Sequence, residues 1–164
     1  VCMHTNLDLA RGGVNDALAR ALGLQDISRV EADADALLRV GMLPGALSMR
    51  DFALLVKRAL GCPGLWYSDA GRPVRCVAVC GGAGGGDAET ALALASGADV
   101  YVSAEFRHHI TLQAQHRGLS LVDAGHFYTE RPVLAALAEY LGNAFPQLEL
   151  RISAQRGTGV FLAE

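Results

Sequence analysis

The segment from residue 74 to residue 141 alternates between short apolar runs and helical patterns. Residues 74–80 are almost continuously apolar, which is typical of a strand buried on both faces. Beyond this run, we expect helices over 88–96 and 105–117 and strands over 99–103 and 119–123. Because helical crossovers join parallel strands, this order predicts an α/β fold with a largely parallel sheet flanked by helices.

The flanking regions carry weaker patterns. Before residue 74 they predict strands over 1–3, 37–43 and 65–68, a polar loop over 4–8, helices beginning at Asn15 and just after Ser48, and a polar surface connection over 25–35. The turn over 69–72 is expected to join the strands 65–68 and 74–80 as a hairpin. After residue 123 they predict a helix with Pro132 in its first turn that runs to about residue 141, and two closing strands over 148–153 and 159–162.

The composition is that of a globular chain. With 164 residues, of which 51% are hydrophobic, residues 1–164 are long enough to form a single α/β unit with its own core. No apolar run reaches the length of a membrane span, and Asp8 and Arg11 interrupt any signal-peptide pattern, so we expect a cytoplasmic protein without a membrane partner. The net charge is −3 and the basic residues are scattered along the sequence, so nucleic acid is not an expected partner. The four cysteines form no CxxC pair and are expected to be reduced thiols, with Cys76 and Cys80 on one face of a strand.

Two short polar segments, 4–8 and 125–130, each end in a carboxylate four residues after a histidine. An imidazole and a carboxylate at this spacing are able to hold a divalent metal ion, which makes these segments the candidate functional site. For Asp8 the alternative is a cap on the helix that follows. For His4 the alternative is a purely structural histidine.

His126 and Glu130 form the stronger of the two pairs. Gly125 permits a sharp turn after a strand, and a helix that starts near residue 127 would place the two side chains one turn apart on the same side. This position, after the carboxyl end of a strand, is where open α/β sheets bind ligands. The alternative is a capped helix with a solvated Glu130.

Glu105 and His109 repeat the four-residue spacing on another expected helix. Neighbouring residues on a helix point about 100° apart, so His108 and His109 are not expected to bind one ion together. We interpret His109 as lining the cleft and His108 as exposed.

The loop over 81–86 contains five glycines and lies between a strand and a helix. Its amides could bind an anion such as phosphate. However, it lacks the GK[ST] signature of a P-loop, and Asp87 at the start of the helix would repel a phosphate. The alternative is a tight structural turn.

Four segments together resemble the GTP cyclohydrolase I type-two homologue family, also known as the Nif-three-like family of dinuclear metal proteins. The segments are HTNLDLARGGVNDALARALGL over 4–24, VAVCGGAGGG over 77–86, GADVYVSAEFRHH over 97–109 and LVDAGHFYTE over 121–130. The resemblance implies an α/β fold, a cleft with two divalent metal ions and ring-like homohexamers. It implies that Asp8, His126 and Glu130 are metal ligands, with Glu130 bridging the two ions. The family's upstream pair of adjacent histidines has no counterpart in this sequence, which looks like the C-terminal two-thirds of a Nif-three-like protein that lacks the N-terminal part.

These expectations lead to a metal-dependent hydrolase acting on a nucleotide or a phosphorylated small molecule. Bound divalent ions would activate water and stabilise developing negative charge, and His4 or His109 would carry protons. The pattern does not distinguish zinc, manganese, iron and magnesium. One alternative is a non-catalytic metal-binding or regulatory scaffold that forms a homo-oligomeric ring. Another is a phosphate-binding module that uses the loop 81–86 without metal.

Overall fold

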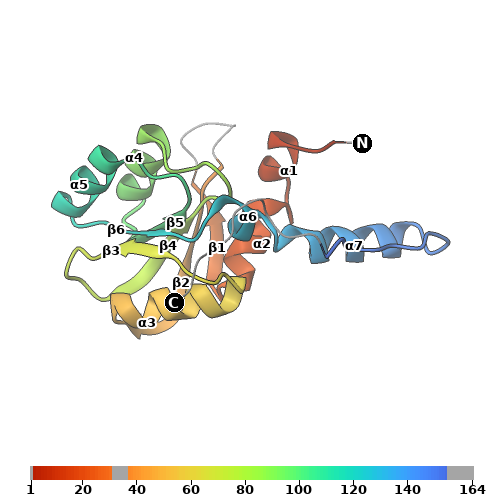
Figure 1. Cartoon of the computed structure of the whole chain (residues 1–164), viewed down its shortest axis with the longest axis horizontal. Coiled ribbons are helices and arrows are strands. Elements are labelled where there is room, and N and C mark those ends of the chain that lie inside the picture. The colour runs from red at the N-terminus through yellow and green to blue at the C-terminus, as the bar shows by residue number, and fades with distance from the viewer. Residues whose placement is uncertain (1, 31–36, 155–164) are drawn as a thin grey trace.

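The computed structural model describes residues 2–30 and 37–154, which form a sheet with helices on both faces (Figure 1). The helices are α1 (Thr5–Leu9), α2 (Val14–Ala21), α3 (Met49–Leu60), α4 (Asp87–Ala95), α5 (His108–His116), α6 (His126–Glu130) and α7 (Val133–Ala144). The strands are β1 (Gln25–Arg29), β2 (Arg39–Leu47), β3 (Trp66–Ser68), β4 (Val74–Val79), β5 (Val100–Ser103) and β6 (Ser120–Asp123). Their order in the sheet is β1-β2-β4-β5-β6-β3.

The centre of the sheet is parallel, as the alternation after residue 74 predicts. β4 pairs with β5 and β5 with β6, both in parallel register. The outer ladders β1–β2, β2–β4 and β3–β6 are antiparallel, so the sheet as a whole is mixed. The α/β class with flanking helices is therefore confirmed, while the parallel part is confined to the three strands that helical crossovers connect.

The central strands are buried on both faces because alternate residues enter two separate cores. Val77 and Val79 pack with α2 and α3 on one face. Ala78 and Cys80 pack with α4 and α5 on the other, and Cys76 packs against the same cluster. This explains the continuous apolar run, and it confirms that Cys76 and Cys80 share one side of the strand.

The predicted hairpin between residues 65–68 and 74–80 is wrong. β3 pairs with β6 at one edge of the sheet, while β4 lies in its centre. Polar contacts with β6 and α5 hold the connecting turn in place. The Ala70 amide donates to Ser120 Oγ at 3.1 Å, and Gln115 Nε2 donates to the Asp69 carbonyl at 2.9 Å. A short turn predicts that the two strands it joins pair with each other, but in this structure contacts with distant residues place β3 beside β6.

Four local predictions need correction. Residues 25–29 form the edge strand β1 instead of a surface connection, and their polarity reflects an edge strand whose side chains are mostly exposed. Residues 4–8 lie largely in the short helix α1, and residues 2 and 3 are not in a strand. The expected strand over 148–153 is absent from the described part of the tail, while 159–162 and residue 1 lie outside the described residues.

Helix α7 projects away from the sheet (Figure 1). Only Val133 is buried among its residues, whereas Leu134, Tyr140 and the following Phe145 are exposed. Ser48 caps α3 as predicted, by accepting a hydrogen bond from the Asp51 amide at 3.1 Å. Within residues 2–30 and 37–154, no helix is long and apolar enough to cross a membrane.

Candidate metal centre

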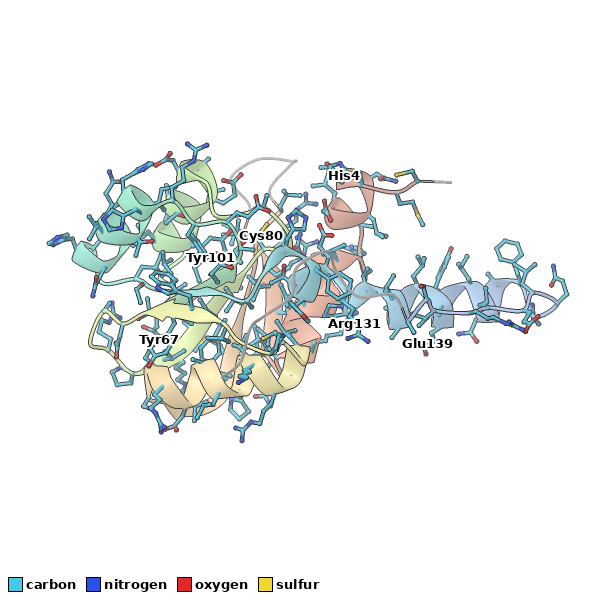
Figure 2. The ribbon with its side chains drawn as sticks, viewed as in Figure 1. His4, Tyr67, Cys80, Tyr101, Arg131 and Glu139 are labelled. Carbon is cyan, nitrogen blue, oxygen red and sulfur yellow. The ribbon has the colours of Figure 1, made fainter. Side chains whose placement is uncertain are left out.

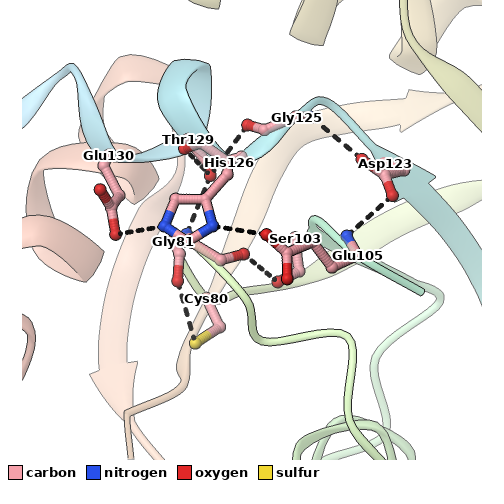
Figure 3. A network of polar contacts seen from close by, with 10 residues as sticks. Cys80, Gly81, Ser103, Glu105, Asp123, Gly125, His126, Thr129 and Glu130 are labelled. Carbon is pink, nitrogen blue, oxygen red and sulfur yellow. Dashed lines mark hydrogen bonds and ion pairs between the residues drawn. The ribbon is translucent and has the colours of Figure 1, made fainter. Parts of the chain in front are cut away.

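The carboxyl ends of the three parallel strands deliver the loops that build the site (Figure 3). β4 leads into the glycine loop, β5 leads to Glu105 and β6 leads to Gly125. Asp123 joins two of these ends, because its carboxylate accepts the Glu105 amide at 2.9 Å and the Gly125 amide at 3.0 Å. The predicted location at the carboxyl edge of the sheet is where the structure puts His126 and Glu130.

His126 lies between two carboxylates. Its Nδ1 is 2.7 Å from Glu105 Oε1, and its Nε2 is 3.1 Å from Glu130 Oε1 (Figure 3). Gly125 turns the chain with a φ of 84°, and α6 begins at His126, so the predicted one-turn spacing to Glu130 is confirmed. The alternative was a capped helix with a solvated Glu130: no side chain caps α6, and the Glu130 side chain is 39% exposed while it contacts the imidazole.

The hydrogen bond that His126 donates to Glu105 raises the pKa of His126 above its usual 6.5, with a further contribution from the negative charge of Glu130. A neutral imidazole donates only one N–H, so it satisfies only one of these carboxylates. If Nδ1–H donates to Glu105, the lone pair of Nε2 faces Glu130, and this contact requires either a second proton or a cation. The arrangement therefore favours a positively charged species at Nε2.

Gly82 lies against this pair. It has a left-handed φ of +70°, and its amide donates to Thr129 Oγ1 at 2.9 Å. A Cβ at this position would lie 2.6 Å from Glu130 Oε1 and 3.2 Å from His126 Nε2. The backbone thus approaches the two side chains at a distance that only glycine allows.

The remainder of the glycine loop is a tight structural turn, the alternative to anion binding. The Gly81 amide donates a hydrogen bond to Asn15 Oδ1 at 2.7 Å, and the Gly84 carbonyl accepts one from the Tyr101 hydroxyl at 2.6 Å. A Cβ at Gly84 would lie 2.6 Å from Ser103 Oγ. With the Gly81 and Gly82 amides occupied and Asp87 in the first turn of α4, the loop is unsuited to hold a phosphate.

Asp8, near the start of the chain, lies beside Glu130 at this edge of the sheet. Buried Asn15 makes the connection, because its Nδ2 donates to the Asp8 carbonyl at 3.1 Å while its Oδ1 holds the glycine loop. Burial raises the pKa of Asp8, and the charges of His4 and His126 oppose this rise. In the described part of the chain, no donor hydrogen-bonds to the Asp8 carboxylate. A half-buried carboxylate in this state is stabilised by a nearby cation.

Asp8 does not cap the next helix, so that alternative is wrong. The N-cap of α2 is Gly13, which has no side-chain cap. Asp16 binds the turn instead, by accepting the Gly12 amide at 2.6 Å.

A cavity of about 380 Å³ opens beside Asp8 and Glu130. His4 and Arg131 also line it, and side chains from α1, α6 and α7 supply an apolar wall. Figure 2 shows His4 on α1 and Arg131 at the start of the projecting α7. Two predicted metal ligands and one predicted proton carrier therefore share one cavity.

His109 is placed differently. It is exposed on α5, and its Nε2 lies 3.8 Å from Asp87 Oδ1 at the start of α4. No contact joins it to Asp8, His126 or Glu130 in the described residues. His108 is exposed, as predicted.

The types of these side chains suit a divalent ion, but their spacing does not. Two carboxylates and an imidazole are typical ligands for zinc, manganese or iron. Among residues 2–30 and 37–154, no three histidine, cysteine or acidic side chains are grouped closely enough to bind one ion together. Glu130 already contacts His126 Nε2 at 3.1 Å, while no hydrogen bond joins Asp8 to either side chain in the described part of the chain.

Sequence reasoning missed two positioning residues, Glu105 and Asn15. The expectation for Glu105 was a helical pair with His109, but the residue lies before α5 with a left-handed φ of 65°. Its place directly after a strand was the available signal. Asn15 was interpreted only as a helix start, and its two contacts depend on tertiary structure.

Replacing Glu105 by Gln is expected to lower the pKa of His126 in the metal-free protein, because the partner that stabilises the imidazolium loses its charge. NMR titration of the imidazole signals measures this, with Glu139→Gln as a control. Since the folded-state pKa lies above the unfolded value of about 6.5, His126 stabilises the fold most below that pH. This contribution is lost as the pH rises through the folded-state pKa. An unchanged titration in Glu105→Gln would contradict the assigned contact.

Comparisons with known proteins agree with this architecture. The family model described as Duf34/NIF3 (NGG1p interacting factor 3) matches residues 1–157. Proteins named GTP cyclohydrolase 1 type 2 homolog are similar: one from Nostoc sp. is 34% identical over 84% of this chain and 54% of its own length, and one from Pseudomonas aeruginosa is 36% identical over 87% and 56%. A Staphylococcus aureus crystal structure shares the fold, with a TM-score of 0.87 and 21% identity over 99% of this chain and 69% of that one.

The chain spans about half the length of the curated relatives it matches. The family match nevertheless covers almost all of the present sequence, including every segment that builds the site. The chain belongs to the Duf34/NIF3 family.

Proposed function

We propose that this chain binds divalent metal ions and contributes to a metal-dependent hydrolase that acts on a nucleotide or a phosphorylated small molecule. The observation that carries the proposal is the convergence of Asp8, His126 and Glu130 on one edge of the sheet. The relatives' name, GTP cyclohydrolase 1 type 2 homolog, is compatible with this class of reaction. No residue of the site identifies guanine as the base.

Each side chain has a separate task in this proposal. Asp8, His126 and Glu130 would hold the metal, with Glu130 bridging when two ions are bound. Glu105 orients the imidazole through Nδ1 and leaves Nε2 directed toward the ion, as outer partners of metal-bound histidines do. Asn15 fixes the Asp8 backbone against the glycine loop. Bound ions would lower the pKa of water and stabilise negative charge on the substrate.

The substrate would occupy the cavity beside Asp8 and Glu130. His4 lines this cavity and is better placed than His109 to accept or return a proton. Arg131 lies at the same wall, where its guanidinium suits an anionic substrate group. Cys2, Cys62, Cys76 and Cys80 are free thiols, which supports a reducing compartment such as the cytoplasm.

The second candidate function is a non-catalytic metal-binding scaffold built from several copies of this chain. The projecting α7 supports self-association, because Leu134 and Tyr140 on it and Phe145 and Leu148 after it are exposed. A second copy that covered these side chains would remove apolar surface from water. A ring of six copies is the assembly that the resemblance suggests.

Purified protein distinguishes the two functions. We expect bound divalent metal by elemental analysis, and hydrolysis of a nucleotide panel that disappears with EDTA and returns with added Mn²⁺ or Zn²⁺. A metal-loaded protein that hydrolyses none of the panel would support the scaffold, especially if light scattering gave the mass of an oligomer. A protein that binds neither metal ion at micromolar concentrations would contradict both.

A further inference from the structure

A second cavity, of about 540 Å³, lies on the other side of the turn between α1 and α2. Four arginines from four different segments line it: Arg11 from the turn, Arg20 from α2, Arg29 from β1 and Arg39 from β2. These residues are scattered along the sequence, and only folding gathers them. None of the residues assigned to the metal centre lines this cavity.

Arg39 forms a fixed and buried part of the wall. Its side chain is only 4% exposed, and its Nη1 donates to the Leu37 carbonyl at 3.0 Å. Its Nε donates to Asp16 Oδ1 at 2.5 Å. Its Nη1 also donates to the Leu38 carbonyl at 3.4 Å, and a guanidinium held by three groups loses little further freedom when it binds a ligand.

Asp16 is the only carboxylate among the lining residues that the structure describes, and both of its oxygens are engaged. Oδ1 accepts from Arg39, and Oδ2 accepts from the Gly12 amide at 2.6 Å. Within residues 2–30 and 37–154, no carboxylate lies within ion-pairing distance of Arg11 or Arg20. Among the described lining residues the arginines therefore outnumber the carboxylates, although the whole chain has a net charge of −3.

We propose that this arginine cavity binds a phosphate-bearing anion, independently of the metal centre. Guanidinium groups match the oxygens of phosphate in paired hydrogen bonds, and several arginines around one cavity suit an anion with more than one negative charge. The volume is within the range of small-molecule sites. The shared chemistry is a diphosphate group, either free as pyrophosphate or carried by a nucleotide.

Calorimetric titration of the full chain with pyrophosphate, in the presence of EDTA, tests this site. The Arg11→Gln/Arg20→Gln double variant should bind at least about tenfold more weakly, because two guanidinium groups that would make charge-assisted hydrogen bonds to the phosphate oxygens are lost. Both side chains are exposed, so the fold should survive, and circular dichroism verifies this. The matched control is Arg50→Gln/Arg58→Gln, which removes the same charge from exposed positions on α3.

A parallel titration with ADP distinguishes the two sources of the diphosphate group. Tighter binding of ADP than of pyrophosphate would indicate a nucleotide, and the reverse would indicate a free anion, while either result supports the site. Glu130→Gln should leave both affinities unchanged. Equal losses in the two arginine double variants, binding that requires metal, or no binding at millimolar pyrophosphate would overturn the proposal.

Discussion

Replacing Glu130 by Gln should leave the chain folded but remove most of its bound divalent metal. Glu130 contacts His126 Nε2 at 3.1 Å and shares a cavity with Asp8, so it is central to the proposed ligand set. An amide has nearly the same shape but no charge, and a cation loses the negative charge that offsets its desolvation. Mutation of residues that only hydrogen-bond to metal ligands lowers metal affinity by about 10–100-fold, so the loss of a direct ligand should lower it by at least tenfold.

Glu139→Gln provides the control for this change. Glu139 is exposed on the projecting α7 (Figure 2). Its replacement by Gln changes the net charge by the same amount at a position that does not contact His126 or Glu130. Metal content by elemental analysis, after equilibration with equal free Mn²⁺ or Zn²⁺, compares the two variants. If Glu130→Gln and Glu139→Gln retained equal metal, Glu130 would not be a ligand.

The centre of the fold could be predicted from the sequence because its signal is strong and local. β4 is apolar apart from the exposed Arg75, and it requires helices on both faces to bury its two sets of apolar side chains. The edges gave no comparable signal. β1 is polar because it lies at an edge, and β3 is only three residues long and pairs with a strand that follows it by about fifty residues.

The candidate site was predictable in its ligand types but not in its supports. His126 and Glu130 are linked by helical spacing, which a sequence displays directly. Asp8 was associated with them through the shared histidine–carboxylate spacing and the family resemblance, since nothing in its own segment specifies the contact across the fold. Glu105 and Asn15 act through hydrogen bonds between distant segments, and no spacing rule encodes such contacts.

The glycine loop shows how one motif has different uses at neighbouring positions. Gly84 and Gly85 are required because a Cβ there would meet Ser103 and the Ala104 carbonyl. Gly82 is required because it faces the candidate ligands. The sequence pattern alone suggested an anion site or a structural turn, and the structure adds a third task, which is to bring backbone against His126 and Glu130.

Replacing Gly82 by Ala is therefore expected to disrupt metal binding by about tenfold or more, from a single added methyl group. The methyl would lie 2.6 Å from Glu130 Oε1 and 3.2 Å from His126 Nε2, so the Glu130 carboxylate would have to shift from its present position. Alanine at a φ of +70° also costs roughly 1–2 kcal/mol of backbone strain. Calorimetric metal titration gives the affinity, and thermal unfolding gives the stability.

Gly23→Ala separates these two effects. Gly23 has nearly the same φ, +72°, and a Cβ there would meet no atom within 4 Å. It should therefore reproduce the loss of stability from strain while leaving metal affinity unchanged. If both variants lost the same stability but neither lost metal, the close approach of Gly82 to the ligands would have no role in binding. If only Gly82→Ala lost metal, the effect would come from the contact with His126 and Glu130 and not from a weakened fold.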